Sequence, residues 1–348
     1  MEVKGRGAQT NPHNRFLKRS LHQDEAGDGL DEPVGPAGAT EYLPVQAKTI
    51  INEVTSPDVG MRWSVNPYQG CEHGCTYCYA RNAHEYWGYS AGLDFERRIL
   101  VKTNAAALLR EALSKPSWQG EPLSIAGNTD CYQPAERKYR LTRQLLEVCL
   151  QFGQPVGLIT KNAGILQDLD VLQALATEGL VHVYFSITTL HEPLRRLMEP
   201  RTATAAAKLN AIAKLTEAGV PCGIMSGPVI PGLNDHELPA IIEAAAAAGA
   251  CSAGYTFVRL NGAIGPIFSA WIEQAFPDRA AKVLRQIAES HGGQLNDSQF
   301  GRRMRGAGTW ADATALLHKQ ASARHLAGRQ MPAYNMAAFR RGGQLPLF

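Results

Sequence analysis

Three cysteines lie within one stretch of eight residues in this sequence. Three residues separate Cys71 from Cys75, and two separate Cys75 from Cys78. Thiolates at this spacing can hold three corners of a cubane iron–sulfur cluster, which leaves the fourth iron open for a substrate or cosubstrate. Gly70 and Gly74 allow the backbone to bend around the sulfur atoms, because glycine has no Cβ. The spacing therefore predicts a catalytic [4Fe-4S] cluster.

Two other interpretations of the cysteines stay open. A zinc site needs a fourth ligand, and His73 lies inside the loop, but the sequence has no second close cysteine pair. The other interpretation is a set of unrelated buried thiols. We expect that structural role for the scattered Cys149, Cys222 and Cys251, because free cysteine behaves as a small apolar side chain.

A repeated pattern of apolar runs and amphipathic stretches must position this loop. The apolar runs cover residues 61–65, 122–127, 155–160, 181–188, 220–226 and 253–260. The helical stretches cover residues 105–113, 137–152, 166–178, 203–218, 236–248 and 278–291. Such alternation predicts a parallel sheet with helices outside, and six units are fewer than a closed barrel needs. We therefore expect an α/β fold, a partial (β/α)6 TIM-like barrel, with ligands at the carboxyl ends of its strands.

Composition divides the chain into three expected parts. Residues 1–45 mix Gly, Pro, Asn and charge without a period, so we expect a weakly ordered, irregular N-terminal extension, with residues 4–17 as a candidate docking piece. The core is expected over residues 46–295, and a basic C-terminal segment with a mobile tail over 296–348. Residues 292–348 hold eight basic against two acidic residues, which suits either nucleic acid or a solvated surface.

The chain carries no sign of export or membrane insertion. Its N-terminus is polar and charged, and its longest apolar run, residues 244–248, is too short to span a bilayer. Seven cysteines, three of them clustered, fit a reducing compartment. We expect a cytoplasmic protein with no membrane partner.

Polar residues follow the predicted strands at the edge where a ligand would bind. Asn128, Thr129 and Asp130 come after the second run. Asp130 suits an ammonium group, because a carboxylate accepts charge-assisted hydrogen bonds; the alternative is a capped turn. Lys161 follows the next run and suits a carboxylate, a phosphate or a salt bridge. Ser186 ends the run after that and can donate a hydrogen bond to a ligand.

The cysteine loop, with Tyr77 before its last cysteine, resembles the signature of the radical S-adenosylmethionine (SAM) superfamily. The turn at residues 129–136 and the stretch at 228–235 resemble the branch of spore photoproduct lyase and DNA repair photolyase-like proteins. The chain as a whole is similar to the PA0069-like family. The resemblance implies that SAM binds the open iron and that a reductant such as flavodoxin or ferredoxin supplies an electron. Cleavage of SAM then yields a 5′-deoxyadenosyl radical, which abstracts a hydrogen atom.

The resemblance also implies roles for the strand-end residues. The turn after the second run would hold the amino group of the SAM methionine, and Ser186 the ribose or carboxylate. Glu199 and Arg201 would meet the charged groups of the methionine, unless they pair with each other. Val229 and Ile230 would lie beside the adenine.

One position departs from the lyase pattern. In spore photoproduct lyase, a cysteine three residues before the aspartate of this turn returns a hydrogen atom, and Gly127 stands there in this chain. Cys131, on the other side of Asp130, is a candidate hydrogen donor, with a structural thiol as the alternative. The resemblance therefore does not imply the same reaction.

The sequence ends in an apolar pentapeptide, Gln344 to Phe348. It resembles the peptide by which bacterial repair proteins and polymerases bind the sliding clamp, where a Leu and a Phe enter an apolar cleft. The alternative is a tail folded onto its own core.

Together these features predict a radical SAM enzyme that acts on damaged or modified nucleic acid, most directly DNA. The first rival is a radical SAM enzyme with a small-molecule, tRNA or protein substrate. The second is a non-catalytic iron–sulfur protein that docks on the clamp.

Overall fold

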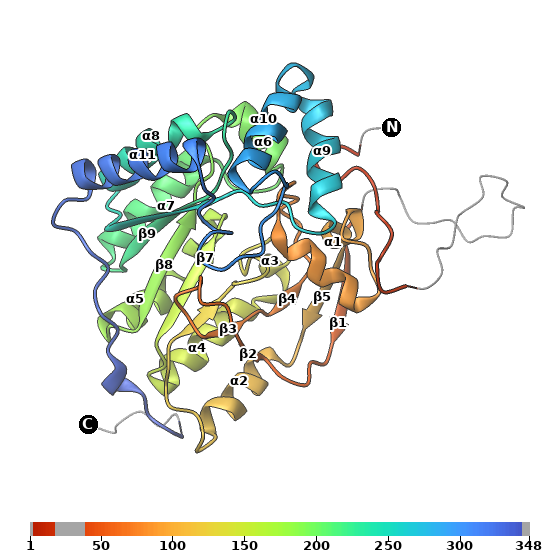
Figure 1. Ribbon diagram of the computed structural model, residues 1–348. Helices are drawn as coiled ribbons and strands as arrows, with labels where there is room; N and C mark the ends of the chain where they lie inside the picture. The colour runs from red at the N-terminus through yellow and green to blue at the C-terminus, as the bar shows by residue number, and fades with distance from the viewer. Residues whose placement is uncertain (1–2, 18–38, 343–348) are drawn as a thin grey trace, which may run out of the picture.

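Seven strands form the sheet at the centre of the molecule: β2 (Ile51–Glu53), β3 (Trp63–Val65), β6 (Leu123–Ile125), β7 (Val156–Thr160), β8 (Val181–Ser186), β9 (Cys222–Val229) and β10 (Ser252–Phe257). The computed structural model describes residues 3–17 and 39–342. The strand order is β10-β9-β8-β7-β6-β3-β2, and every pair is parallel except β2 with β3 (Figure 1). Within the described residues β10 and β2 are the unpaired edges. The six parallel strands, β3, β6, β7, β8, β9 and β10, confirm the predicted open (β/α)6 barrel.

The parallel strands are buried on both faces, which explains their nearly continuous apolar sequences. In β7 and β8 the paired Leu158 and Val183 are almost fully buried. The helices that follow the strands cover the outer face of the sheet (Figure 1): α2 (Ala105–Ser114), α4 (Leu141–Phe152), α5 (Leu169–Thr177), α7 (Ala205–Glu217) and α8 (Leu238–Ala247). Each turns an apolar stripe inward, such as Leu145, Cys149 and Phe152 of α4. The main core lies between these stripes and the sheet.

The predicted helix over residues 137–152 is wrong as a single element. The structure has α3 (Glu136–Tyr139) and α4, and Arg140 between them lies in the left-handed region at φ 51°. Arginine gives no sequence signal for that conformation, because glycine and asparagine are its usual occupants. Other predicted helices begin with a 3₁₀ turn: η2 (Ala163–Asp168) precedes α5, and η3 (Asp235–Glu237) precedes α8.

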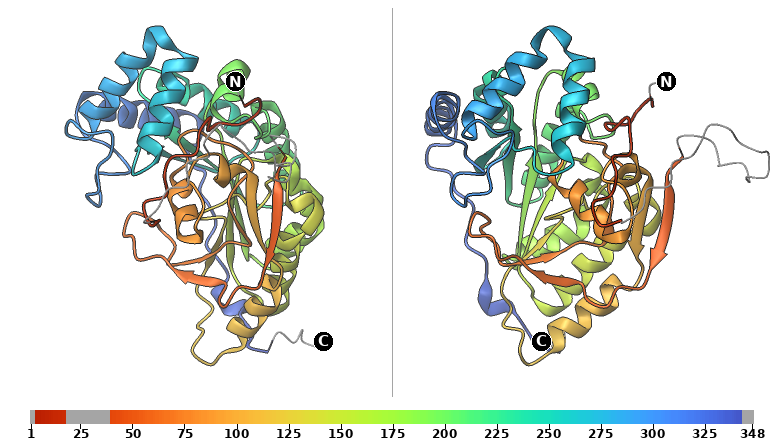
Figure 2. Two further views of the ribbon diagram at one scale, coloured as in Figure 1. Left: turned by 90° about the vertical axis from the view of Figure 1, so that its right-hand side faces the viewer. Right: turned by 45° about the vertical axis from the view of Figure 1, so that its right-hand side comes forward.

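A second, small sheet was not predicted. β1 (Glu41–Val45) pairs in parallel with β5 (Arg98–Lys102), which pairs antiparallel with β4 (Tyr68–Gln69). The expectation of an irregular extension up to residue 45 is therefore wrong for residues 41–45. They form a strand because they pair with a strand more than fifty positions away in the sequence. Residues 3–17 also contact the core, as Figure 2 shows beside α1 (Leu93–Arg97).

Five further helices surround the carboxyl ends of the strands and the outer edge of β10: η1 (Tyr79–Trp87), α6 (Glu192–Met198), α9 (Ile264–Ala275), α10 (Pro277–Ser290) and α11 (Thr309–His325). The short η4 (Met336–Ala338) lies at the opposite end, beside the residues that precede β7 and β8. α11 packs against α8 and β10 within the basic C-terminal segment. The predicted domain boundaries stay predictions, and the pentapeptide at 344–348 lies outside the described residues. No helix in the described part of the chain is both long and apolar enough to cross a membrane.

Candidate active site

The cysteine loop follows β3 and β4 and ends where η1 begins. Gly70 and Gly74 both adopt positive φ, at 84° and 69°, so the backbone bends at the two glycines beside the first two cysteines. A Cβ at Gly70 would lie 2.8 Å from the carbonyl oxygen of Arg98, and one at Gly74 would lie 2.9 Å from a Glu96 oxygen. Glycine is therefore required at both positions by conformation and by space.

A fully buried ion pair fixes the loop from beneath. The Arg81 guanidinium bonds Glu96 and donates to the Cys75 carbonyl oxygen from Nε (3.0 Å) and Nη2 (2.8 Å). Glu96 in turn accepts from the backbone N–H groups of Gly7 (3.1 Å) and Ala8 (2.7 Å). The N-terminal residues therefore share one carboxylate with the arginine that holds the middle cysteine.

The three thiols lie where burial disfavours their charged form. Cys71 and Cys75 are 7% and 6% exposed, and Cys78 is half-buried. Burial raises the pKa of all three thiols, and nearby Asp130 and the other thiols raise that of Cys71 further. Iron bound there would stabilise the thiolates that burial disfavours.

The zinc alternative finds no support in the geometry. His73 is 1% exposed and lies against Asp130, with its Nδ1 3.3 Å from a carboxylate oxygen. Among residues 3–17 and 39–342, no group of three or more His, Cys, Asp or Glu side chains is arranged around one ion position. A cubane cluster is larger and holds its sulfur ligands further apart.

A buried charge network lies directly beside Cys75. Glu199 is fully buried, and its Oε1 accepts from Lys161 Nζ at 3.0 Å and from the Tyr77 hydroxyl. Its other oxygen is 3.6 Å from Lys208 Nζ. Burial alone would raise the pKa of Glu199, but the two lysines outweigh it and hold that pKa below its ordinary value. Two ammonium groups face the Glu199 carboxylate, and the nearby Asp130 carboxylate also raises the pKa of both lysines.

Lys161 is the centre of that network. Besides Glu199 it donates to Ser186 Oγ (2.7 Å), Thr188 Oγ1 (3.2 Å) and the carbonyl oxygen of Gly227 (3.2 Å). Burial opposes its charge, but Glu199 and Cys75 raise its pKa above the ordinary value. The structure thus brings together three predicted site residues, Lys161, Ser186 and Glu199. Lys161 forms a salt bridge with Glu199, which was one of the alternatives that the sequence left open for this lysine.

Asp130 holds two strand ends together. Its Oδ1 accepts from Tyr132 N (2.8 Å) and Thr160 Oγ1 (2.7 Å), and its Oδ2 accepts from Lys161 N (2.7 Å). Burial would raise the pKa of Asp130, but His73 and these hydrogen bonds lower it overall. The geometry matches the capped-turn alternative, because these donors already surround the carboxylate.

Asn128, Thr129 and Arg201 contact the protein around the loop. Asn128 donates to Gln69 Oε1 at 3.3 Å, and buried Thr129 donates to the Tyr68 carbonyl oxygen at 2.7 Å. Arg201 lies 3.5 Å from a Glu72 oxygen, so the predicted alternative of a Glu199–Arg201 pair is wrong. Glu199 has two lysines as partners instead.

The other predicted residues lie in the apolar cores. Cys131 and Val229 belong to the main core, where Cys131 is fully buried and its pKa is raised well above the ordinary value by burial. That placement favours the structural alternative for Cys131. Ile230 is fully buried in a second apolar cluster that also contains Cys75 and Tyr77.

Sequence analysis missed Lys208 and Thr188 in the network. Lys208 is 2% exposed and bonds the Ser186 carbonyl oxygen at 3.0 Å. Burial lowers its pKa despite Glu199. The sequence does hold a signal for Lys208, because it occupies a core-facing position of an amphipathic helix. A lysine is rarely buried without a partner, so this position indicates a buried counter-charge or hydrogen-bond acceptor.

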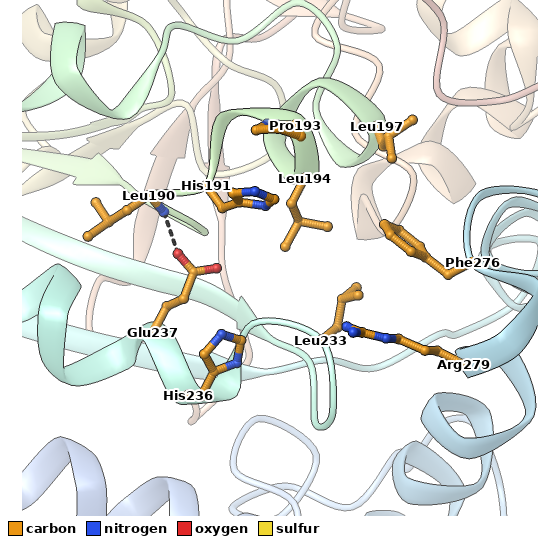
Figure 3. A pocket seen from close by; sticks show the side chains of 10 residues that line it. All are labelled: Leu190, His191, Pro193, Leu194, Leu197, Leu233, His236, Glu237, Phe276 and Arg279. Atoms are coloured by element: carbon orange, nitrogen blue, oxygen red, sulfur yellow. Dashed lines mark hydrogen bonds between the residues drawn. The ribbon is translucent and has the colours of Figure 1, made fainter.

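A cavity of about 770 Å³ opens beside these strand ends, in the size range of ligand pockets. Figure 3 shows Leu194 of α6 and Leu233 of the β9–α8 connection facing Phe276 and Arg279 across it. Glu237 is fixed at its edge, where it accepts from Leu190 N at 2.7 Å. Leu194 and Leu233 also pack in the cluster that contains Cys75. The cavity therefore shares part of its wall with the apolar cluster that contains Cys75 and Tyr77.

Comparisons with known proteins decide the family. A profile of the Radical SAM superfamily matches residues 65–245, which include the cysteine loop and the charge network. The uncharacterized protein Rv2578c of Mycobacterium tuberculosis is 34% identical over 241 residues, 68% of this chain and 71% of that protein. The chain belongs to the radical SAM superfamily. Its members are enzymes that use a [4Fe-4S] cluster, as the cysteine spacing predicts, and SAM, as the resemblance implies.

More distant relatives and solved structures extend the comparison. The Radical SAM Nα-GlyT isomerase of Pseudomonas phage M6 is 25% identical over 240 residues, covering 65% of this radical SAM chain and 48% of that protein. Spore photoproduct lyase complexed with dinucleoside spore photoproduct superposes with a TM-score of 0.61 at 15% identity, over 82% of this chain and 80% of that one. At that identity the likeness shows the fold.

Proposed function

We propose that Cys71, Cys75 and Cys78 hold the [4Fe-4S] cluster of this radical SAM enzyme. The observation that carries the proposal is the juxtaposition of two buried thiols and one half-buried thiol with a buried lysine–glutamate network at the carboxyl ends of parallel strands. When bound, the cluster supplies the electron that cleaves SAM to a 5′-deoxyadenosyl radical. The protein's part is to hold the loop, exclude water and orient SAM.

The charge network is proposed to set the position of SAM. Lys161 and Lys208 supply positive potential for the methionine carboxylate through the network, with Ser186 and Glu199 fixing the lysine geometry. Asp130 keeps its proposed place near the methionine by joining the ends of β6 and β7. Asn128 and Thr129 bring backbone groups of the same turn toward the amino group, Arg201 lies at the rim, and Val229 with Ile230 forms the apolar wall for adenine.

The proposed substrate is damaged or modified nucleic acid, in a lyase-like repair reaction. One comparison supports this class: spore photoproduct lyase, which has the same fold, was solved in complex with a dinucleoside photoproduct. The basic segment after α10 supports it independently. The second candidate is a small-molecule, tRNA or protein substrate, and the apolar cavity beside α6 favours a small molecule among these.

Stimulation of SAM cleavage tests the substrate class. Reconstituted, reduced enzyme is incubated without oxygen with SAM and DNA oligonucleotides that carry defined lesions or modified bases. We expect 5′-deoxyadenosine to form faster with one of these oligonucleotides than with the unmodified strand. Stimulation by small molecules, tRNA or peptides, with none by DNA, would move the proposal to the second candidate.

The cellular setting completes the proposal. We propose a cytoplasmic enzyme that receives its electron from flavodoxin or ferredoxin and that binds the bacterial sliding clamp through residues 344–348. A non-catalytic iron–sulfur protein docked on the clamp is the rival account, and formation of 5′-deoxyadenosine excludes it.

A further inference from the structure

The open side of the barrel is bridged by one loop, residues 295–308 between α10 and α11. At one edge, Phe257 N of β10 donates to the Met304 carbonyl oxygen at 2.9 Å. Toward the other edge, Arg303 bonds Asp58 and Ser56 of the turn between β2 and β3, and Gly301 N donates to Asp58 at 2.6 Å. The loop therefore spans the gap between β10 and the β2–β3 turn, where a large substrate would reach the barrel from the side.

Positive charge gathers at this bridge without matching negative charge. Arg259, just past the end of β10, lies close enough to Arg303 to feel its charge, and burial together with Arg303 lowers the pKa of Arg259. Arg305 stacks over the Tyr255 ring, with its guanidinium carbon 4.6 Å from the ring centroid. Arg303 is paired with Asp58, which also acts electrostatically on Arg259, but neither Arg259 nor Arg305 forms a salt bridge with a carboxylate within residues 3–17 and 39–342. Arg305 is exposed and Arg259 is half-buried, and both guanidinium groups can donate charge-assisted hydrogen bonds to an anion.

Exposed aromatic rings flank the same charges. Phe300, 55% exposed, lies under the Arg303 guanidinium at 4.4 Å. Tyr79, 50% exposed, follows Cys78 directly, bonds the Gly127 carbonyl oxygen and interacts electrostatically with Arg259. Guanidinium groups recognise phosphate oxygens, and exposed rings stack on unpaired bases.

We infer that Arg259 and Arg305 bind the phosphodiester backbone of a nucleic acid strand that crosses the Arg303 bridge, with Phe300 stacking on a base. The inference rests on the proposed nucleic acid substrate and adds its path: the strand passes over the β10 edge and delivers one nucleotide past Tyr79 to the cluster. Arg303 acts as a strut that holds the bridge, since its charge is already paired.

The test measures binding of unmodified oligonucleotides, separately from SAM cleavage. Fluorescence anisotropy is recorded over a salt series with a single DNA strand, the corresponding duplex and the RNA strand of the same sequence. The proteins are wild type, Arg259→Gln, Arg305→Gln, the double variant and Phe300→Ala. Arg110→Gln, on exposed α2 at the far end of the molecule, makes the same change of charge and is the control.

For the double variant we expect at least tenfold weaker binding of a single strand. The slope of log K against log salt should fall by about 0.7 for each arginine that contacts a phosphate. Arg259→Lys should retain most of that slope, and Phe300→Ala should weaken binding at least fivefold. Arg110→Gln should bind as wild type. Thermal unfolding of each variant identifies any loss of folding.

Equal binding by wild type and the double variant would overturn the inference. Absence of binding by wild type to all three probes would overturn it too. Neither result touches the proposed function, which depends on whether DNA stimulates SAM cleavage. Tighter binding of the duplex or of the RNA than of the DNA strand would still support phosphodiester binding by the two arginines. The bound nucleic acid would then be duplex DNA or RNA instead of single-stranded DNA.

Discussion

Gly7 touches the cysteine loop so closely that one methyl group there should disturb the cluster. A Cβ on Gly7 would lie 1.7 Å from the Gly74 carbonyl oxygen and 2.8 Å from its carbon. Both atoms are backbone, so no side-chain rotation can relieve the overlap. Gly7→Ala therefore forces either the N-terminal segment off the core or the loop between Cys71 and Cys75 out of place.

The cost follows from what must break. Overpacking of this kind costs about 1–3 kcal/mol. Lifting the segment also removes the Gly7 and Ala8 hydrogen bonds to the buried Glu96 carboxylate, each worth about 1.5–3 kcal/mol. The released segment gains conformational entropy, which offsets part of this cost. We therefore expect the free energy of unfolding to fall by about 2–4 kcal/mol.

The assay is anaerobic reconstitution followed by iron and sulfide analysis and by the rate of bleaching in air. Gly7→Ala should hold less iron than wild type and bleach several-fold faster, because the segment over the loop is displaced. Gly60→Ala is the matched control, since a Cβ at Gly60 meets nothing within 4 Å. Wild-type iron content and bleaching rate in Gly7→Ala would refute the role given to the N-terminal segment.

Three further predictions concern the network, the pH dependence and the tail. Glu199→Gln removes the carboxylate that contacts both Lys161 and Lys208 and should lower the free energy of unfolding in urea by about 3–5 kcal/mol. Glu217→Gln on the surface of α7 should change it little, and similar midpoints for the two variants would contradict the network. Burial raises the pKa of Glu136 from 4.5 to about 7, so the folded state binds the proton of this carboxyl more tightly than the unfolded state does. The free energy of unfolding should therefore fall by roughly 3 kcal/mol as pH rises from 4.5 to 7. Glu136→Gln should remove this dependence of the free energy of unfolding on pH. An unchanged slope in Glu136→Gln would show that other groups cause it. Wild type should recover the bacterial sliding clamp in a pull-down, and a Leu347→Ala, Phe348→Ala double variant should not. Equal recovery of the clamp by both proteins would exclude the tail as the clamp-binding peptide.

The sequence predicts the features that depend on local patterns. Six apolar runs alternating with helical periods predict the six parallel strands, because each run and each amphipathic stretch carries its own period. The cysteine spacing predicts the cluster loop, and Gly70 and Gly74 adopt the bends expected of them. These features are encoded within a few residues of where they appear.

Features that depend on distant partners could not be predicted in the same way. β1 is a strand because of β5, and Glu96, which pairs with Arg81, accepts a hydrogen bond from Ala8 more than eighty residues away. Asp130 was assigned to a ligand, but its oxygens accept from Thr160 and Lys161 of the next strand end. Strand ends that meet only in the folded sheet decide whether such a side chain faces a ligand or a neighbour.

Formation of 5′-deoxyadenosine by the reconstituted protein tests the central claim most directly. Wild type, Cys75→Ala and Cys149→Ala are reconstituted without oxygen, reduced with dithionite and incubated with SAM. Cys149 is a fully buried core thiol away from the loop and serves as the matched control. The account predicts 5′-deoxyadenosine from wild type and Cys149→Ala and none from Cys75→Ala. A wild-type protein that carries a full cluster and yields none, or a Cys75→Ala variant that yields as much as wild type, would contradict it.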